Sequence, residues 1–168
     1  MNITIRSEEE RDIEAIHSIT IEAFKTVAIS NKTEQFIIKA LRRANALSVS
    51  LVAEVEDTVI GHIAFSPIVI SDGSTDWYTL GPISVKPAFQ KNGVGGALIE
   101  KGISMVKKTG GRGCLLVGDP KYYSRYGFKT DSRLSIDGVP PDVLLVQPFF
   151  EPVPEGKVQL HEGFWSRE

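Results

Sequence analysis

The segment Val85-Lys86-Pro87-Ala88-Phe89-Gln90-Lys91-Asn92-Gly93-Val94-Gly95-Gly96-Ala97 connects two predicted elements of different type. The residues before it, Trp77–Val85, are typical of a strand, and apolar residues after it recur at helical spacing to about Lys108. The first turn of this helix is therefore rich in glycine. A helix begins with N–H groups that have no helical partner, and glycine lets an anion approach the backbone closely. The segment predicts a binding site for a phosphate or pyrophosphate.

Three phosphate-binding motifs make different demands on this loop. A P-loop needs Gly-Lys followed by Ser or Thr, and the chain has no such sequence. A dinucleotide fingerprint would use Gly93 and Gly95, but its third position is Leu98, and seven residues separate Val85 from Gly93. The third motif, Gln or Arg followed after two residues by Gly-x-Gly or Gly-x-Ala, matches Gln90–Gly95 at every fixed position. The alternative is a glycine-rich turn that only packs a helix on a sheet, with Asn92 as the helix cap.

The elements around this segment alternate between helices and strands. Before it, the pattern predicts a strand at Ile3–Ile5, a helix after a capping box at Ser7–Glu10, a second helix from Asn31, and strands at Val49–Glu56 and Val59–Ile70. After it, we expect a strand at Cys114–Val117, a short helix at Lys121–Tyr126, a strand at Val143–Val146 and a final loop or edge strand. This order predicts a mixed sheet with helices on its faces.

Gly81-Pro82 interrupts the strand that leads into the loop. Proline removes a donor from the hydrogen-bond ladder, and glycine inside a strand often marks a bulge. We therefore expect a bulge at this point, or a place where pairing with a neighbouring strand ends.

The overall composition indicates an ordinary globular protein, with 42% hydrophobic residues, 24% charged residues and a net charge of −2. No basic face for nucleic acid is expected, and no apolar run is long enough for a membrane span. Cys114 is the only cysteine, which excludes an internal disulfide and suits the cytoplasm. His17, His62 and His161 are far apart and do not indicate a metal site. The length fits one domain.

Three more segments accompany the loop motif: Leu80–Val85, Gly118-Asp119-Pro120 and Tyr122–Phe128. With them the chain resembles the GNAT superfamily of N-acetyltransferases, and within it the YhbS-like branch. The resemblance implies one N-acetyltransferase domain over residues 1–168, with α/β architecture. It implies a central, mostly antiparallel sheet with a splayed and bulged strand, and helices on both faces. The implied reaction moves the acetyl group of acetyl-coenzyme A to a primary amine by direct attack on the thioester.

The same resemblance implies which residues hold acetyl-coenzyme A. The loop would bind the pyrophosphate through its backbone, with the predicted contacts at Gln90, Lys91, Asn92, Gly93, Val94, Gly95 and Gly96. The pantetheine arm would lie along Ile83, Ser84 and Val85 as an added strand. Such an arrangement needs unpaired backbone groups on that strand, and a bulge at Gly81-Pro82 that separates it from Cys114–Val117 would supply them.

Acyl transfer to an amine needs a neutral amine, donors for the developing oxyanion and a proton for the leaving thiolate. We expect the backbone N–H of Ile83 or Val85 at the oxyanion. By resemblance Tyr123 is the proton donor, because a phenol with a pKa near 10 is protonated at neutral pH. The alternative is that this tyrosine only packs in its short helix. The base is not singled out, and a water chain is one possibility; the candidate side chains are Glu22, Glu34, Asp76 and His62.

The acceptor is a small-molecule or protein amine whose identity the sequence does not reveal. Glu22, Asn31 and Glu34 lie in the region that contacts acceptors in this fold, and the two acidic residues would suit a cationic acceptor. The main alternative function is a non-catalytic acyl-coenzyme A binding or sensor module, and nucleotide binding is a weaker one. The chain is expected to be a monomer or homodimer, with Phe149-Phe150 and Phe164-Trp165 covering the core or forming an interface.

Overall fold

The computed structural model describes residues 1–168, and its centre is a seven-stranded sheet. The strand order is β1-β2-β3-β5-β6-β9-β7, and only β5 and β6 are parallel neighbours. This confirms the predicted mixed, mostly antiparallel sheet. The strands are β1 (Thr4–Ser7), β2 (Val49–Val55), β3 (Thr58–Pro67), β5 (Trp77–Val85), β6 (Gly113–Val117), β9 (Leu144–Pro148) and β7 (Lys129–Thr130).

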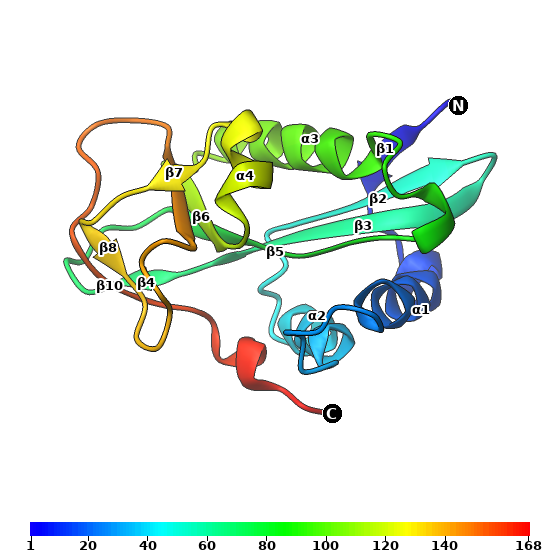
Figure 1. Ribbon diagram of the computed structural model, residues 1–168, viewed down its shortest axis with the longest axis horizontal. Coiled ribbons are helices and arrows are strands. Elements are labelled where there is room, and N and C mark those ends of the chain that lie inside the picture. Colours follow the sequence, from blue (N-terminus) through cyan, green and yellow to red (C-terminus); the bar gives the residue numbers. More distant parts are fainter.

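Helices cover both faces of this sheet (Figure 1). The helices α3 (Val94–Lys108) and α4 (Pro120–Tyr123) lie on one face, and α1 (Ile13–Phe24) and α2 (Glu34–Arg43) lie on the other. Single turns of 3-10 helix complete the connections: η1 (Glu10–Asp12), η2 (Pro87–Phe89), η3 (Ser124–Tyr126) and η4 (Glu162–Trp165). No helix is long and apolar enough to cross a membrane.

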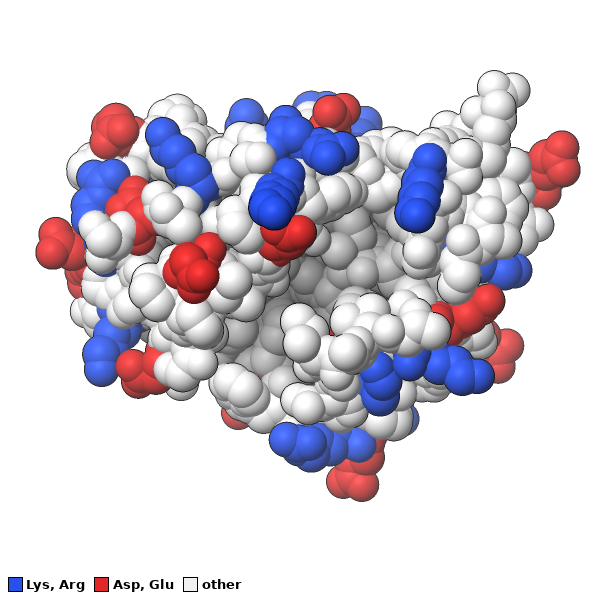
Figure 2. All heavy atoms as spheres, viewed as in Figure 1, with Lys and Arg blue, Asp and Glu red and all other residues white.

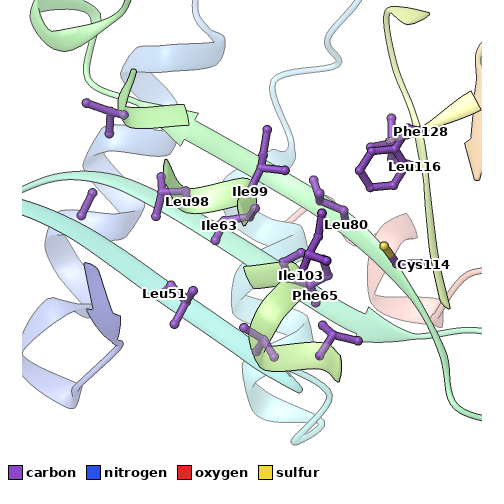
Figure 3. Close-up of a cluster of buried hydrophobic side chains, with 14 of the residues drawn as sticks. Leu51, Ile63, Phe65, Leu80, Leu98, Ile99, Ile103, Cys114, Leu116 and Phe128 are labelled. Atoms are coloured by element: carbon purple, nitrogen blue, oxygen red, sulfur yellow. The ribbon is translucent and has the colours of Figure 1, made fainter. Parts of the chain in front are cut away.

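The largest hydrophobic cluster fills the space between α3 and the sheet (Figure 3). Leu98, Ile99 and Ile103 of α3 lie over Ile63 and Phe65 of β3 in a region that excludes water. The α3 helix comes very close to the sheet at Gly102, where a Cβ atom would be 2.3 Å from Cε1 of Phe65. Helix and sheet thus meet at a position that only glycine fits.

Cys114 belongs to the same cluster and is fully buried. Burial raises the pKa of its thiol, so the reactive thiolate is not formed at neutral pH. The expectation of a core cysteine is confirmed.

A second sheet, which the sequence did not predict, has the order β4-β10-β8. Its strands are β4 (Val69–Ile70), β8 (Leu134–Ser135) and β10 (Gly156–Gln159). Because these strands have two to four residues, none contains enough alternation to be recognised in a sequence. Ile70, Leu134 and Val158 pack in one cluster with Trp77 and Leu115 of the large sheet, so the two sheets share a core.

Two predicted helix starts were wrong. Ser7 ends strand β1, and the side chain of Asp12 rather than Glu10 accepts a backbone N–H at 2.7 Å, that of Glu9. The second helix begins at Glu34 instead of Asn31, and the Ser30 hydroxyl bonds to the Glu34 carboxylate. The capping box is formed two residues later than predicted, by Glu9 and Asp12, and in the second case Ser30 rather than Asn31 bonds to the first helical residue. Several polar residues in each stretch could take these places, so a residue pattern does not choose between them.

The aromatic pairs near the C-terminus divide between core and surface. Phe149 packs against the main cluster and Phe164 packs with Leu41 of α2. Phe150 and Trp165 are exposed to 60% and 70%. Each pair therefore covers the core with one ring only.

The contact between Gly102 and Phe65 can be tested by substitution. We expect Gly102→Val to lower the free energy of unfolding by about 2 kcal/mol or more, because the added methyl groups overpack the core. Lys101→Val is the matched control, since Lys101 is exposed on the same helix. It should lose only about 0.5 kcal/mol through helix propensity. Urea unfolding measures both, and equal losses would contradict the packing described here.

Candidate active site

The site begins at an irregularity in β5. Ile83 is opposite Ile63 of β3, whereas Leu80 is opposite Phe65, so Gly81 and Pro82 together face one residue of β3. This is the bulge that the sequence predicted. On its other edge, β5 pairs with β6 only from Trp77 to Thr79. The two parallel strands therefore separate at the bulge.

The separation leaves backbone groups of β5 without a strand partner. In an antiparallel pair, hydrogen-bonded and non-bonded positions alternate. Lys86 donates its N–H to the Ile60 carbonyl at 2.8 Å, so Ser84, two residues earlier, also directs its backbone toward β3. The N–H and C=O groups of Ile83 and Val85 consequently point into the gap. One of them is engaged, because the Gln90 side chain donates to the Val85 carbonyl at 3.0 Å.

A cavity of about 320 Å³ lies at this gap. Figure 2 shows the surface hollowed between the side of α3 and α4 and the side of α1 and α2, with Lys and Arg side chains along the α3–α4 rim. Most of the lining is apolar. The cavity is lined by Ala23, Phe24, Val27, Ile83, Ser84, Val85, Phe89, Gln90, Lys91, Val94, Gly95, Tyr122 and Tyr123.

The loop before α3 presents a run of backbone donors beside this cavity. The first helical hydrogen bond of α3 is from Ala97 to Gly93, and no backbone N–H from Lys91 to Gly96 donates to an acceptor in the protein. Gly93 has φ of +83°, in the left-handed region that favours glycine. Asn92 does not cap the helix, since its side chain donates to the Gln90 carbonyl at 3.0 Å. These donors and the helix dipole suit an anion.

The next two glycines, Gly95 and Gly96, also determine how closely a neighbouring helix approaches. A Cβ atom at Gly95 would be 3.0 Å from the Tyr122 hydroxyl, and one at Gly96 would be 2.5 Å from the Tyr126 hydroxyl. These glycines therefore make room for the tyrosines of α4 and η3 against the first turn of α3. Burial raises the pKa of the Tyr122 phenol, and the hydroxyl of Tyr126 raises it further.

Tyr123 lies on the cavity wall, opposite the strand edge at Ile83 and Val85. Its ring packs edge-on against Tyr122 and Phe128, with centroid distances of 4.9 Å and 6.1 Å. Burial raises the pKa of its phenol above the usual 10, so it carries a proton throughout the neutral range. Asp119, just upstream, accepts the N–H of Lys121 at 2.9 Å and caps α4.

The carboxylates considered as bases or acceptor contacts do not line the cavity. Glu22 lines a different pocket, together with Lys86 and Asp57. The carboxylate of Glu34 accepts a hydrogen bond from the Ser30 hydroxyl. Asp76 is exposed at the start of β5, outside the cavity. Asn31 is also absent from the lining. The structure thus places none of these four residues on the cavity wall, and a role for the two acidic ones toward a cationic acceptor stays a prediction.

The sequence reasoning missed the α1 wall of the cavity. Ala23 and Phe24 of α1 line it, together with Val27 beyond the end of the helix. In the sequence, Ile13, Ile16, Thr20, Phe24 and Val27 form a mostly apolar stripe at helical spacing. An apolar stripe indicates that one face of a helix is turned away from solvent, but it does not show whether that face packs in the core or lines a cavity.

His62 is the remaining candidate and is fully buried on the α1–α2 face of the sheet. Its Nε2 atom is 2.8 Å from the Ser50 hydroxyl, and Ser50 donates to Glu8 at 2.6 Å. Burial lowers the pKa of His62 to about 4, despite the nearby Glu8 carboxylate. The imidazole is therefore neutral at neutral pH.

Comparison with known proteins gives a consistent result. The family model of the acetyltransferase (GNAT) domain matches residues 46–130, which contain the bulged strand, the loop and Tyr123. The N-acetyltransferase YhbS of Escherichia coli K12 is 29% identical over 110 residues, which are 65% of this chain and 66% of that relative's length.

Two solved structures are similar over nearly their whole length. A GNAT family acetyltransferase from Brucella melitensis in complex with acetyl-CoA is 42% identical, with a TM-score of 0.87 over 97% of this chain and 98% of that one. Escherichia coli YhbS in complex with CoA is 25% identical, with a TM-score of 0.84 over 98% and 92%.

The buried neutral histidine makes stability depend on pH. His62 has a pKa of about 4 in the folded protein. The histidine of the unfolded chain has a pKa near 6.5, so between pH 6.5 and 4 the unfolded state binds a proton at this residue and the folded state does not. Stability is therefore fully present above pH 6.5 and falls as the pH drops toward 4, by up to about 3 kcal/mol from this residue. Urea unfolding from pH 7 to 4 should show this slope, and His62→Gln should remove its share.

Proposed function

Because the chain belongs to the GNAT acetyltransferase family, we propose that it transfers the acetyl group of acetyl-coenzyme A to an amine. The observation that carries this proposal is the run of unbonded N–H groups from Lys91 to Gly96 beside the open edge of β5. Such donors fit a pyrophosphate, and an open strand edge fits the amide-containing pantetheine arm. Acetyl-coenzyme A supplies the activated acyl group.

In this proposal each side of the cavity has its own binding role. The loop from Gln90 to Gly96 holds the phosphates through its backbone, and the Lys91 side chain adds positive charge at the rim. The backbone groups of Ile83 and Val85 hold the pantetheine arm, whereas the backbone of Ser84 between them is directed toward β3. The carbonyl of Val85 is released when the Gln90 side chain, which now occupies it at 3.0 Å, moves away.

The proposed chemistry uses the chain's own donors. The N–H of Ile83 or Val85 stabilises the charge that develops on the carbonyl oxygen, since both donors point into the gap. Tyr123 gives its proton to the sulfur as the C–S bond breaks. The Tyr123 phenol carries a proton throughout the neutral range, so it can donate to the thiolate.

The acceptor end of the site favours an apolar amine. Ala23 and Phe24 of α1 and the nearby Val27 form one apolar wall, and no carboxylate lines the cavity. An acceptor with several positive charges would find no partner there, whereas an aromatic or aliphatic body would bury apolar surface. We further propose that residues 1–168 act as one domain, which the shared core of the two sheets supports.

Binding of acetyl-coenzyme A is the direct test of the loop. We expect Gly93→Ala to weaken binding at least about tenfold, because a side chain strains the φ of +83° and displaces N–H donors to the phosphate. Gly73→Ala is the matched control: its φ is +85°, its surroundings are equally open, and it does not line the cavity. Calorimetry should find unchanged affinity for this control. Equal affinities for all three proteins would contradict the assignment.

Turnover tests the chemistry. We expect Tyr123→Phe to lower kcat about 100-fold with unchanged affinity for acetyl-coenzyme A, and to do so equally across the neutral pH range. Tyr78→Phe, in the paired part of β5, is the control. Release of free thiol is followed with 2-phenylethylamine, cyclohexylamine, spermidine and a lysine peptide, and the two apolar amines should react fastest. Binding without transfer to any amine would instead indicate a non-catalytic acyl-coenzyme A binding module.

A further inference from the structure

A chain of hydrogen bonds crosses the buried α1–α2 face of the sheet and orients His62. Arg42 donates to both oxygens of Glu8, at 2.8 Å and 2.9 Å, and holds the pKa of this carboxyl below its usual range although burial opposes it. An ionised carboxylate only accepts, so the single hydrogen of the Ser50 hydroxyl goes to Glu8. Ser50 must then accept the hydrogen of His62 Nε2. This selects the tautomer in which Nδ1 is a bare acceptor.

The Nδ1 atom of His62 is buried and has no hydrogen-bond partner. A buried polar atom without a partner costs about 1–3 kcal/mol, so an unpartnered acceptor in the centre of a sheet calls for an explanation. A lone pair held in one orientation by Ser50 and Glu8 is suited to accepting a proton.

Ser84 connects this histidine to the cavity. It lies on β5 directly opposite His62, and it lines the cavity. Opposite residues in an antiparallel pair have Cβ atoms about 4.5–5.5 Å apart, so the Ser84 hydroxyl is a near neighbour of the His62 ring, with no hydrogen bond between them in the resting structure. The hydrogen bond that Ser84 makes in this structure is a long one. The Thr20 hydroxyl donates to the Ile16 carbonyl at 2.7 Å, and its oxygen is 3.5 Å from the Ser84 hydroxyl oxygen.

We propose that Ser84 and His62 form the route by which the attacking amine loses its proton, which rests on the acyl transfer proposed above. As the C–N bond forms and the C–S bond breaks, an N–H bond of the amine breaks and its proton moves to Ser84 Oγ. The hydroxyl proton of Ser84 moves to His62 Nδ1. The sulfur takes its proton from Tyr123. His62 acts through Ser84, so it is a positioning residue for this transfer.

The charges around His62 suit a transient cation. Glu8 is 3.7 Å from Nε2 and favours the imidazolium, as does Asp12, whereas Arg42 and burial disfavour it. From α1 and β5 the groups nearby are the uncharged Thr20 and Ser84. The imidazolium is therefore short-lived, and its proton returns through Ser84 to the cavity, where it replaces the proton that Tyr123 gave to the sulfur.

The variant His62→Gln distinguishes a role of His62 as a proton acceptor from a role in holding the hydrogen bond to Ser50. Glutamine keeps a donor for Ser50 but has no basic nitrogen. With acetyl-coenzyme A and the fastest amine of the panel, we expect kcat to fall about 100-fold, and Ser84→Ala to fall similarly, with unchanged affinity for acetyl-coenzyme A. The loss of kcat in both variants should become smaller as the pH approaches the amine pKa of about 10, because hydroxide can then take the proton in place of Ser84 and His62. Ser66→Ala, which removes a buried hydroxyl of β3 that also has no hydrogen-bond partner, should leave activity unchanged.

A second measurement needs no acceptor. In ¹⁵N NMR spectra of the full chain labelled at histidine, His62 should be the neutral Nε2–H tautomer from pH 6 to 8. An Nδ1–H tautomer would overturn the proposal, as would a His62→Gln enzyme within twofold of the parent or a deficit that is independent of pH. Because the tautomer is read without any amine, failure of this relay can be distinguished from failure of the proposed acyl transfer.

Discussion

The end of pairing between β5 and β6 is the constraint on which the site depends. Up to Thr79 the two strands share a ladder, and beyond the bulge they do not. The N–H and C=O groups of Ile83 and Val85 would be satisfied in a regular sheet, and here they face a cavity. The same gap gives α1 and α4, from opposite faces of the sheet, access to one volume. Without the bulge there would be neither open donors nor a cavity.

The close approach of α4 and η3 to α3 depends on small residues. Gly95 and Gly96 admit the hydroxyls of Tyr122 and Tyr126, and Gly118 admits the ring of Tyr123. A side chain at any of these positions would push the tyrosines away from the cavity wall. The glycine-rich first turn thus serves two purposes: Gly93 adopts a left-handed backbone that frees the donors, and the next two glycines position the aromatic wall.

The two faces of the central sheet differ in chemistry. The face under α3 is a continuous apolar cluster, which holds the strands in place. The face under α1 and α2 contains a much smaller apolar cluster and several buried polar groups, among them Thr20, His62 and Ser84. Buried polar groups are costly unless they are bonded, so their concentration on one side of the cavity is more readily explained by chemistry than by stability.

Local sequence was sufficient to predict β5, its bulge, the glycine-rich loop and helix α3, because each depends on neighbouring residues: Gly81-Pro82 disturbs its own ladder, and apolar spacing after Gly93 gives a helical face. It also identified Tyr123 and the loop as candidate site residues. Other features required residues distant in sequence to be brought together. The second sheet has strands too short to carry a pattern, and the carboxylates Glu22 and Glu34 could not be placed relative to the cavity. The meeting of Ser84 with His62 follows from strand register, and a one-residue shift in register would turn every side chain to the opposite face.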